Sequence, residues 1–149
     1  MQMPDMEPSY LLFGTIFALE NRLQVLGDRL LKEITAKQWF VLVVLGLFGE
    51  KAPTLGELAE EVGSSYQNVK QIALKLEKKG YVTLESDKSD RRKCLVRPTR
   101  QWFELGEKYN APSTRFMEQL FAGIPQEEIR RAVWVLQGLQ HNSKTMGKD

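Results

Sequence analysis

The sequence predicts a mainly α-helical chain with one small β-hairpin, which places it in the α+β class. Three observations predict this. Apolar residues recur at helical spacing along most of the chain, two Ser/Thr capping signatures stand close together near its middle, and a short stretch at 81–85 alternates as a strand does. With 149 residues the chain fits a single domain, which we expect to span 1–149.

Composition narrows the class of protein. The chain is 42% hydrophobic and 27% charged, as in ordinary globular proteins. A single cysteine, Cys94, excludes an intrachain disulfide and favours a reducing compartment. The longest apolar run, 39–48, is about half a membrane span, and the N-terminus lacks the pattern of a signal peptide. We therefore expect a soluble, cytoplasmic protein with no membrane partner.

The first expected helix covers about 9–31. Leu12, Ile16, Leu19 and Leu23 are spaced four, three and four residues apart, as in a coiled-coil seam. Neighbouring aromatic side chains widen this stripe beyond what one packing partner needs, so we predict dimerisation through 9–34. Packing inside its own subunit is the alternative.

A pair of short helices follows in the middle of the chain. Thr35 is expected to cap an apolar, buried helix at about 36–49. Thr54 and Glu57 form a capping box that opens a helix over 54–62, Gly63 ends it, and Ser64 opens the next helix. That helix runs to Gly80, with Ser64 and Gln67 as its capping box. Two helices joined by so tight a glycine turn are a helix-turn-helix.

The stretch after Gly80 reads as a hairpin and two more helices. Strands at 81–85 and 94–97 enclose a polar loop, 86–93, and a hairpin in this position is a wing. Thr99 is expected to cap a helix over about 100–122 that Pro112 kinks or interrupts. Pro125 is expected in the first turn of a last helix that runs to about 142 and whose stripe contains Ile129, Val133 and Leu136. The winged core is thus expected at 35–99, and a second dimerisation segment at 100–142.

The outer face of the helix over 64–79 carries the side chains that are expected to contact a partner. Net charge is only +2, but residues 64–93 hold eight basic and four acidic side chains, a local net charge of +4 that favours a polyanionic partner. Glutamine side chains can hydrogen-bond adenine edges, and lysine side chains can contact phosphates, so this face is suited to DNA. The alternative is that it is an ordinary solvated helix face. The predicted DNA contacts are Ser64, Ser65, Gln67, Asn68, Lys70, Gln71, Lys75, Arg91, Arg92 and Lys93.

These motifs together resemble the MarR (multiple antibiotic resistance regulator) family of winged helix-turn-helix transcription factors. The resemblance covers about 10–142 and is carried by Gln38-Trp39, by the run Leu74-Lys75-Leu76-Glu77-Lys78-Lys79-Gly80-Tyr81-Val82, and by the loop Asp87-Lys88-Ser89-Asp90-Arg91-Arg92. The family's loop commonly reads Asp-x-Arg-Asp-x-Arg. Here Ser89 replaces the first arginine, and Pro98 stands where leucine is usual.

The resemblance implies a homodimeric regulator of double-stranded DNA, expected to be a repressor. Its two recognition helices would enter consecutive major grooves and its wings would face minor grooves, where Arg91 and Arg92 suit a narrow, electronegative groove. Asp90 and Arg92 can alternatively form an ion pair that holds the wing. Family members often respond to small aromatic effectors, for which the predicted pocket residues are Tyr10, Phe13, Phe17, Trp39 and Trp102.

Other chemistry is disfavoured by the residues available. His141 is the single histidine and lies far from Cys94 in the sequence, which gives no metal site or Cys-His pair. No phosphate-binding glycine loop appears. We expect no enzyme, no catalytic residue and no cofactor. The competing function is a winged-helix protein–protein interaction module without sequence-specific DNA binding, which would expose aliphatic side chains on the wing and the outer helix face.

Overall fold

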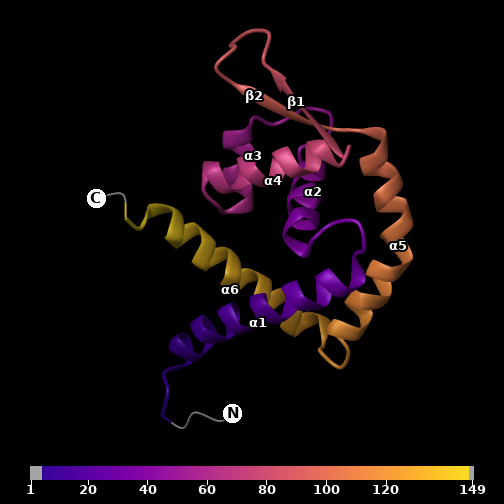
Figure 1. Cartoon of the computed structure of the whole chain (residues 1–149). Helices are drawn as coiled ribbons and strands as arrows, with labels where there is room; N and C mark the ends of the chain where they lie inside the picture. The colour runs from indigo at the N-terminus through magenta and orange to yellow at the C-terminus, as the bar shows by residue number, and fades with distance from the viewer. Residues whose placement is uncertain (1–4, 148–149) are drawn as a thin grey trace. The chain divides into compact units, whose positions relative to one another are not determined.

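The computed structural model describes residues 5–147, which form helices and one hairpin in the predicted order (Figure 1). The fold class predicted from the sequence is confirmed. The elements are α1 (Pro8–Leu30), α2 (Ala36–Leu47), α3 (Leu55–Val62), α4 (Tyr66–Lys78), β1 (Val82–Ser86), β2 (Cys94–Pro98), α5 (Arg100–Leu120) and α6 (Gln126–Thr145).

The chain divides into two compact units, one ending at Lys108 and the other beginning at Tyr109. The first unit holds α1 to α4, the hairpin and the first turns of α5. The second holds the rest of α5 and all of α6.

The core of the first unit lies where α2, α3, α4 and the base of the hairpin meet. Leu58, Val69 and Leu76 are completely buried there, and Val82 and Val96 bring the two strands into the same core. Apolar burial of this kind contributes roughly 1.5–3 kcal/mol for each large side chain. The short helices are stable because their apolar faces share this core.

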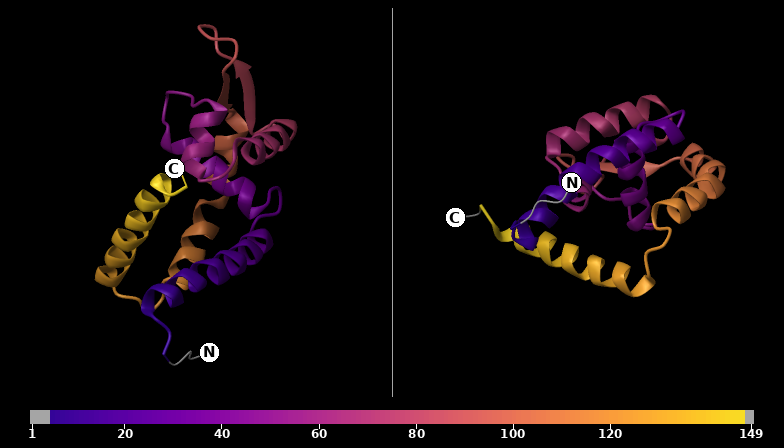
Figure 2. Two further views of the ribbon diagram at one scale, coloured as in Figure 1. Left: turned by 90° about the vertical axis from the view of Figure 1, so that its left-hand side faces the viewer. Right: turned by 90° about the horizontal axis from the view of Figure 1, so that it is seen from below.

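The hairpin is antiparallel and projects away from the helices (Figures 1 and 2). Its register pairs Leu84 with Val96 and Ser86 with Cys94. The β2 side is fastened to the turn before α3, where the Val96 amide donates to the carbonyl of Pro53 at 2.9 Å. The loop at the tip therefore lies beyond the packed part of the unit.

Two helices begin at the threonines that the sequence indicates. Thr35 caps α2 and Thr54 caps α3, each within a complete capping box formed with Gln38 or Glu57. Gly63 ends α3 in the left-handed conformation at φ +80°, where a side chain would be strained. Local hydrogen bonding thus determines where these helices start and stop.

The structure corrects the predicted all-round burial of the second helix. Val41, Leu42 and Leu45 of α2 are buried, but Phe40 is 46% and Leu47 78% exposed. Within the first unit only one side of α2 packs against α3 and α4, so its apolar residues outnumber the positions that this unit covers.

Three details of the later helices also differ from expectation. Pro112 lies inside α5 without interrupting it, although a proline removes one helical hydrogen bond. The Thr99 hydroxyl, expected to cap α5, donates to the Gly80 carbonyl at 2.6 Å and so joins the end of α4 to the start of α5. Pro125 occupies the N-cap of α6 rather than its first turn.

Candidate nucleic-acid interface

The turn between α3 and α4 sets the direction of α4. Ser65, not Ser64, is the N-cap of α4, because its hydroxyl accepts the Asn68 backbone amide at 3.2 Å. The Ser64 hydroxyl instead accepts the Asn68 side-chain amide at 2.8 Å. The predicted capping box of Ser64 and Gln67 is therefore wrong by one residue, since the Gly63 turn lasts one residue longer before the helix begins.

The two faces of α4 differ in the way the sequence predicts. Val69, Ala73 and Leu76 are fully buried. Gln67 and Gln71 are exposed on the other side, with Lys75 exposed toward the end of the helix and Lys70 half-buried. The exposed side therefore offers amides with both donors and acceptors, flanked by ammonium groups.

The last lysine before Gly80, Lys79, is also exposed, but its ammonium group is engaged by other parts of the chain. The Lys79 ammonium donates to the carbonyl of Glu33 and to the side-chain oxygen of Gln38, both at 3.0 Å. Glu33 in turn pairs with Lys108 of α5. Lys79 therefore fastens the end of α4 to the junction between α1 and α2, and its charge is committed away from the outer face.

The wing loop is held by its own acidic residues. Asp87 accepts the amide and hydroxyl of Ser89, and these hydrogen bonds lower the pKa of its carboxyl group. Asp90 accepts the backbone amide and guanidinium of Arg92, which lower the pKa of Asp90 in the same way. Both carboxylates are thus ionised and ordered at neutral pH.

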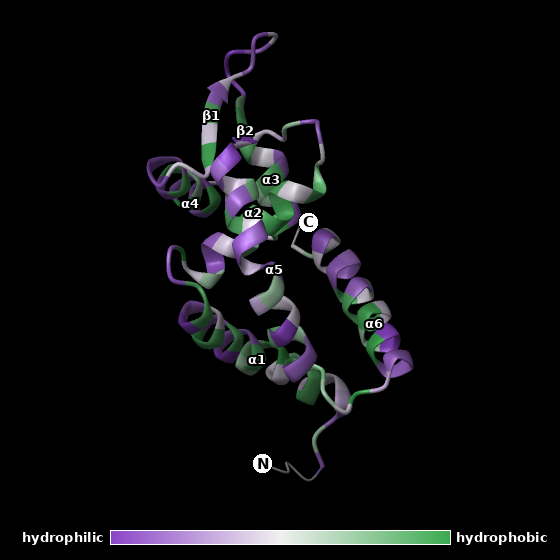
Figure 3. Ribbon diagram, turned by 90° about the vertical axis from the view of Figure 1, so that its right-hand side faces the viewer, coloured by the Kyte–Doolittle hydropathy of each residue, from purple (hydrophilic) through white to green (hydrophobic). Residues whose placement is uncertain are grey.

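The remaining basic residues of the loop are exposed. Arg91 and Lys93 point into solvent, and the side chain of Arg92 stays 91% exposed although it pairs with Asp90 at 3.1 Å. Figure 3 shows the loop as a hydrophilic tip on a more apolar hairpin. With the exposed Lys88, the structure therefore presents four cationic side chains on a loop whose shape is set by two aspartates.

Cys94 is the first residue of β2, opposite Ser86 and next to the wing loop. Partial burial raises the pKa of its thiol, and the negative charge of Glu77 raises it further. A thiol with a raised pKa holds little thiolate at neutral pH and reacts slowly. This environment gives Cys94 the character of a packing residue.

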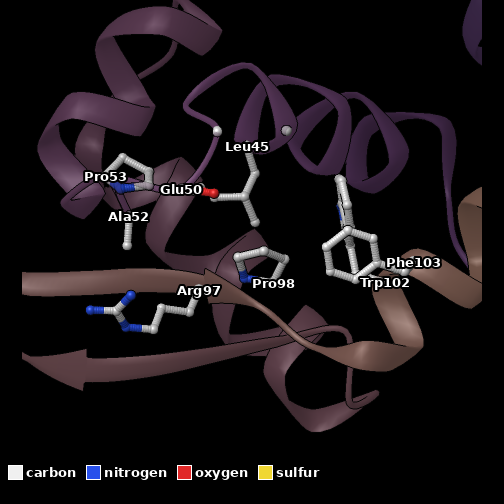
Figure 4. Close-up of a pocket in the computed structure, with 10 residues that line it drawn as sticks. Leu45, Glu50, Ala52, Pro53, Arg97, Pro98, Trp102 and Phe103 are labelled. Atoms are coloured by element: carbon white, nitrogen blue, oxygen red, sulfur yellow. The ribbon is translucent and has the colours of Figure 1, made fainter.

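A cleft opens between the end of α2, the root of the wing and the start of α5. It has a volume of about 430 Å³, and Trp102 is the predicted effector contact that lines it. Figure 4 shows Leu45 and Pro98 facing each other, with Trp102 and Phe103 at one end and Arg97 at the other. The predicted effector residues on α1 lie outside the lining of this cleft.

The residues predicted to form the dimer interface lie on α1 and α6, whose own side chains are not buried. None of the residues of α1 or α6, all of which the structure describes, is buried. Leu19 is 46% and Val133 is 46% exposed, and Figure 3 shows hydrophobic bands along both helices. Each helix thus keeps an apolar stripe at its surface. The other predicted members, exposed or half-buried, are Leu12, Ile16, Leu23, Ile129 and Leu136.

Two other kinds of site are missing from the described residues. Between residues 5 and 147 no three His, Cys, Asp or Glu side chains cluster as metal ligands would. In the same part of the chain no helix is both long and apolar enough to cross a bilayer.

Comparison with known proteins identifies the winged part of the chain. Residues 33–93 match the model of the MarR family. No curated protein sequence matches the chain.

Solved structures extend the likeness to nearly the whole chain. A MarR/EmrR family transcriptional regulator from Acinetobacter sp. ADP1 is similar with a TM-score of 0.80 and 19% identity, over 95% of this chain and 100% of that one. MepR of S. aureus, solved as a DNA complex, gives a TM-score of 0.77 and 18% identity, over 93% and 99%.

A third structure concerns regulation of DNA binding of Bordetella bronchiseptica BpsR by 6-hydroxynicotinic acid. It is similar with a TM-score of 0.73 and 20% identity, over 87% of this chain and 98% of that one. The predicted resemblance is confirmed: residues 33–93 match the model of the MarR family, and the chain has the fold of the solved MarR-family regulators.

Proposed function

We propose that the chain is a sequence-specific regulator of transcription, a repressor, that binds double-stranded DNA as a homodimer. One observation carries this proposal. Glutamine and lysine side chains stand exposed on the outer face of α4, beside a wing loop that exposes Arg91, Arg92 and Lys93. In a helix-turn-helix protein the second helix enters the major groove, and a basic loop suits the minor groove.

Each predicted DNA contact has a distinct role in this proposal. Gln67 and Gln71 are one helical turn apart and address base edges, while Lys70 and Lys75 meet phosphates along the groove. Ser64, Ser65 and Asn68 lie at the N-terminus of α4, a place that favours a phosphate group.

The proposed dimer is formed by the terminal segments, 9–34 and 100–142. Their exposed apolar stripes support it, because large apolar patches on a folded chain usually mark an interface. Two winged cores held this way would present two recognition helices to one duplex, each reading one half-site.

The proposed effector is a small aromatic molecule that releases the DNA. Two of the similar structures support both halves of this idea, since one is a DNA complex and the other concerns control of DNA binding by 6-hydroxynicotinic acid. In this chain the predicted effector contacts remain Tyr10, Phe13, Phe17, Trp39 and Trp102.

Selection from random duplex tests the proposal. The purified full chain should enrich a partly palindromic sequence, and its affinity for that duplex should fall about 10³–10⁵-fold between 50 and 200 mM salt if the dimer makes roughly 6–10 phosphate contacts. A panel of small aromatic acids, including 6-hydroxynicotinic acid, is then titrated against the complex. No enrichment, or an affinity that ignores salt, would refute DNA binding.

A protein-interaction module is the second candidate, and one observation favours it. Tyr66 is 45% and Leu74 41% exposed on α4, so the outer helix face carries two apolar side chains as well as amides. If the chain is a protein-interaction module, neither the parent chain nor Leu74→Ser binds duplex DNA, and the selection from random duplex does not converge on a sequence.

A further inference from the structure

The recognition helix contains one acidic residue, Glu77, and its presence there needs a reason. A carboxylate on a helix that docks against phosphates weakens binding by charge repulsion. The other ionisable side chains of α4 between Tyr66 and Lys78 are lysines and a tyrosine. The direction in which Glu77 points supplies the reason.

The carboxylate of Glu77 lies against the outer edge of the wing. Its Oε2 accepts the backbone amide of Leu84, in the middle of β1, at 2.7 Å. Leu84 stands opposite Val96 in the register of the hairpin. Leu84 and Val96 form a non-hydrogen-bonded pair of the antiparallel ladder. In such a pair both backbone amides point away from the partner strand, so each must find an acceptor elsewhere.

The two outward amides are satisfied on opposite sides of the hairpin. The Val96 amide donates to the Pro53 carbonyl, next to the start of α3, whereas the Leu84 amide donates to Glu77 on α4. A two-stranded hairpin is marginal by itself and takes its direction from what holds its edges. The edge of β2 is fastened to the α3 side, and the edge of β1 to the recognition helix.

The bond from Glu77 is suited to fixing an angle. A hydrogen bond to an ionised acceptor is shorter and roughly twice as strong as one between neutral groups. Only residues 79–81 connect α4 to β1, so the chain and the Glu77 bond close a small ring between helix and strand. The wing is then constrained to turn with α4 as one body.

We propose that Glu77 is a positioning residue that aims the wing, so that the contribution of Arg91 to DNA binding depends on the Glu77–Leu84 bond. The inference rests on the proposed function. Its consequence is that the only acid of the recognition helix increases specific binding through the wing, although its charge opposes binding.

A double-mutant cycle on the selected duplex tests this proposal. Glu77→Ala and Glu77→Gln remove the same charge, but only glutamine keeps an oxygen that can accept the Leu84 amide. Arg91→Ala should weaken binding about tenfold in the wild-type and Glu77→Gln backgrounds. In the Glu77→Ala background Arg91→Ala should weaken binding less than about twofold. The difference between the two backgrounds would then exceed the roughly twofold deviation within which the effects of independent sites add.

Glu77→Asp serves as the second variant, because it keeps the charge while its shorter side chain withdraws from Leu84. It replaces Glu77→Ala in the cycle if that chain does not fold, and the same loss of coupling is expected. Amide hydrogen exchange without DNA gives a separate readout: residues 82–98 should exchange faster in Glu77→Ala and Glu77→Asp, with α2 and α3 unchanged.

Three results would overturn the inference. These are an equal Arg91→Ala cost in every background, no Arg91→Ala cost in the wild-type chain, or unchanged exchange over 82–98. A wild-type chain that selects a duplex with the expected salt response but shows no coupling refutes the role of Glu77 alone. A wild-type chain that selects no duplex refutes the proposed function as well.

Discussion

The direction of each lysine on α4 decides what its charge does. Lys75 stands exposed on the outer side, whereas Lys79, one turn later, donates backward to Glu33 and Gln38. Gln38 is the buried polar residue of the core at 7% exposure, and its side-chain oxygen also accepts the Thr35 amide. A lysine that satisfies a buried amide contributes to the fold, so a count of charges along the helix overstates the field that faces DNA.

The first prediction separates base reading from phosphate contact. Gln67→Ala and Gln71→Ala should each weaken binding to the selected duplex by about 1–3 kcal/mol and leave a scrambled duplex nearly unchanged. Lys75→Ala should weaken binding to both duplexes alike and reduce the salt slope by about one unit. Fluorescence anisotropy on both duplexes at several salt concentrations measures these effects. Equal losses on both duplexes for the glutamine variants would show that they do not read bases.

The elements are held together mainly at their ends. Gly80 follows α4 at φ +90°, its amide donates to the Glu77 carbonyl at 2.9 Å, and the Tyr81 amide donates to the Leu76 carbonyl at 3.0 Å. This arrangement is a Schellman motif, which needs a residue in the left-handed region. The Gly80 carbonyl accepts the Thr99 hydroxyl, so one short turn connects the recognition helix, the wing and α5.

Gly80→Ala should therefore destabilise the chain by more than about 1 kcal/mol. The new Cβ would be strained at this φ and would also collide with the side chain of Gln101. Urea unfolding followed by circular dichroism gives the free energy. Gly56→Ala is the matched control: Gly56 lies within α3, where an added Cβ meets only the Thr54 hydroxyl at 3.8 Å, so the change should be neutral or stabilising. Equal destabilisation by both variants would contradict the special role of the Gly80 turn.

At the scale of the whole molecule, the terminal helices carry more apolar surface than the described chain covers. On α1, Phe13 is 63% and Phe17 57% exposed, and the two rings make an edge-on contact with centroids 5.0 Å apart. On α6, Trp134 is 76% exposed. Surfaces of this kind in a stable protein favour a second copy of the chain as their partner.

If the proposed dimer forms, Leu19→Asp and Leu23→Asp should each give unfolded chain rather than a stable monomer, because the dimer and the fold would share one core. Sedimentation equilibrium and circular dichroism report association and folding together. A well-folded monomer from either leucine variant would argue against interleaved terminal helices.

The order and the approximate ends of the elements follow from sequence alone. Thr35, Thr54, Gly63 and Gly80 begin or end helices through hydrogen bonds that span at most five residues, so a reading of local spacing finds them. The period of apolar residues likewise identifies the buried face of α4. The exposed glutamine and lysine face of that helix, and the basic wing beside it, are also predictable, because an inward stripe fixes which residues point outward.

Tertiary structure alone decided how those elements are joined. The Lys79 bonds to Glu33 and Gln38 span 46 and 41 residues, and no local pattern marks the lysine that turns inward. The choice of Ser65 over Ser64 depends on how far the Gly63 turn carries the chain before α4 begins, and the exposure of Phe40 depends on which side of α2 the other helices cover. The role of Glu77 appears only when β1 presents an outward amide beside it. Spacing along a chain encodes helices and turns because their hydrogen bonds are local, whereas the contacts that aim the wing form between segments that only folding brings together.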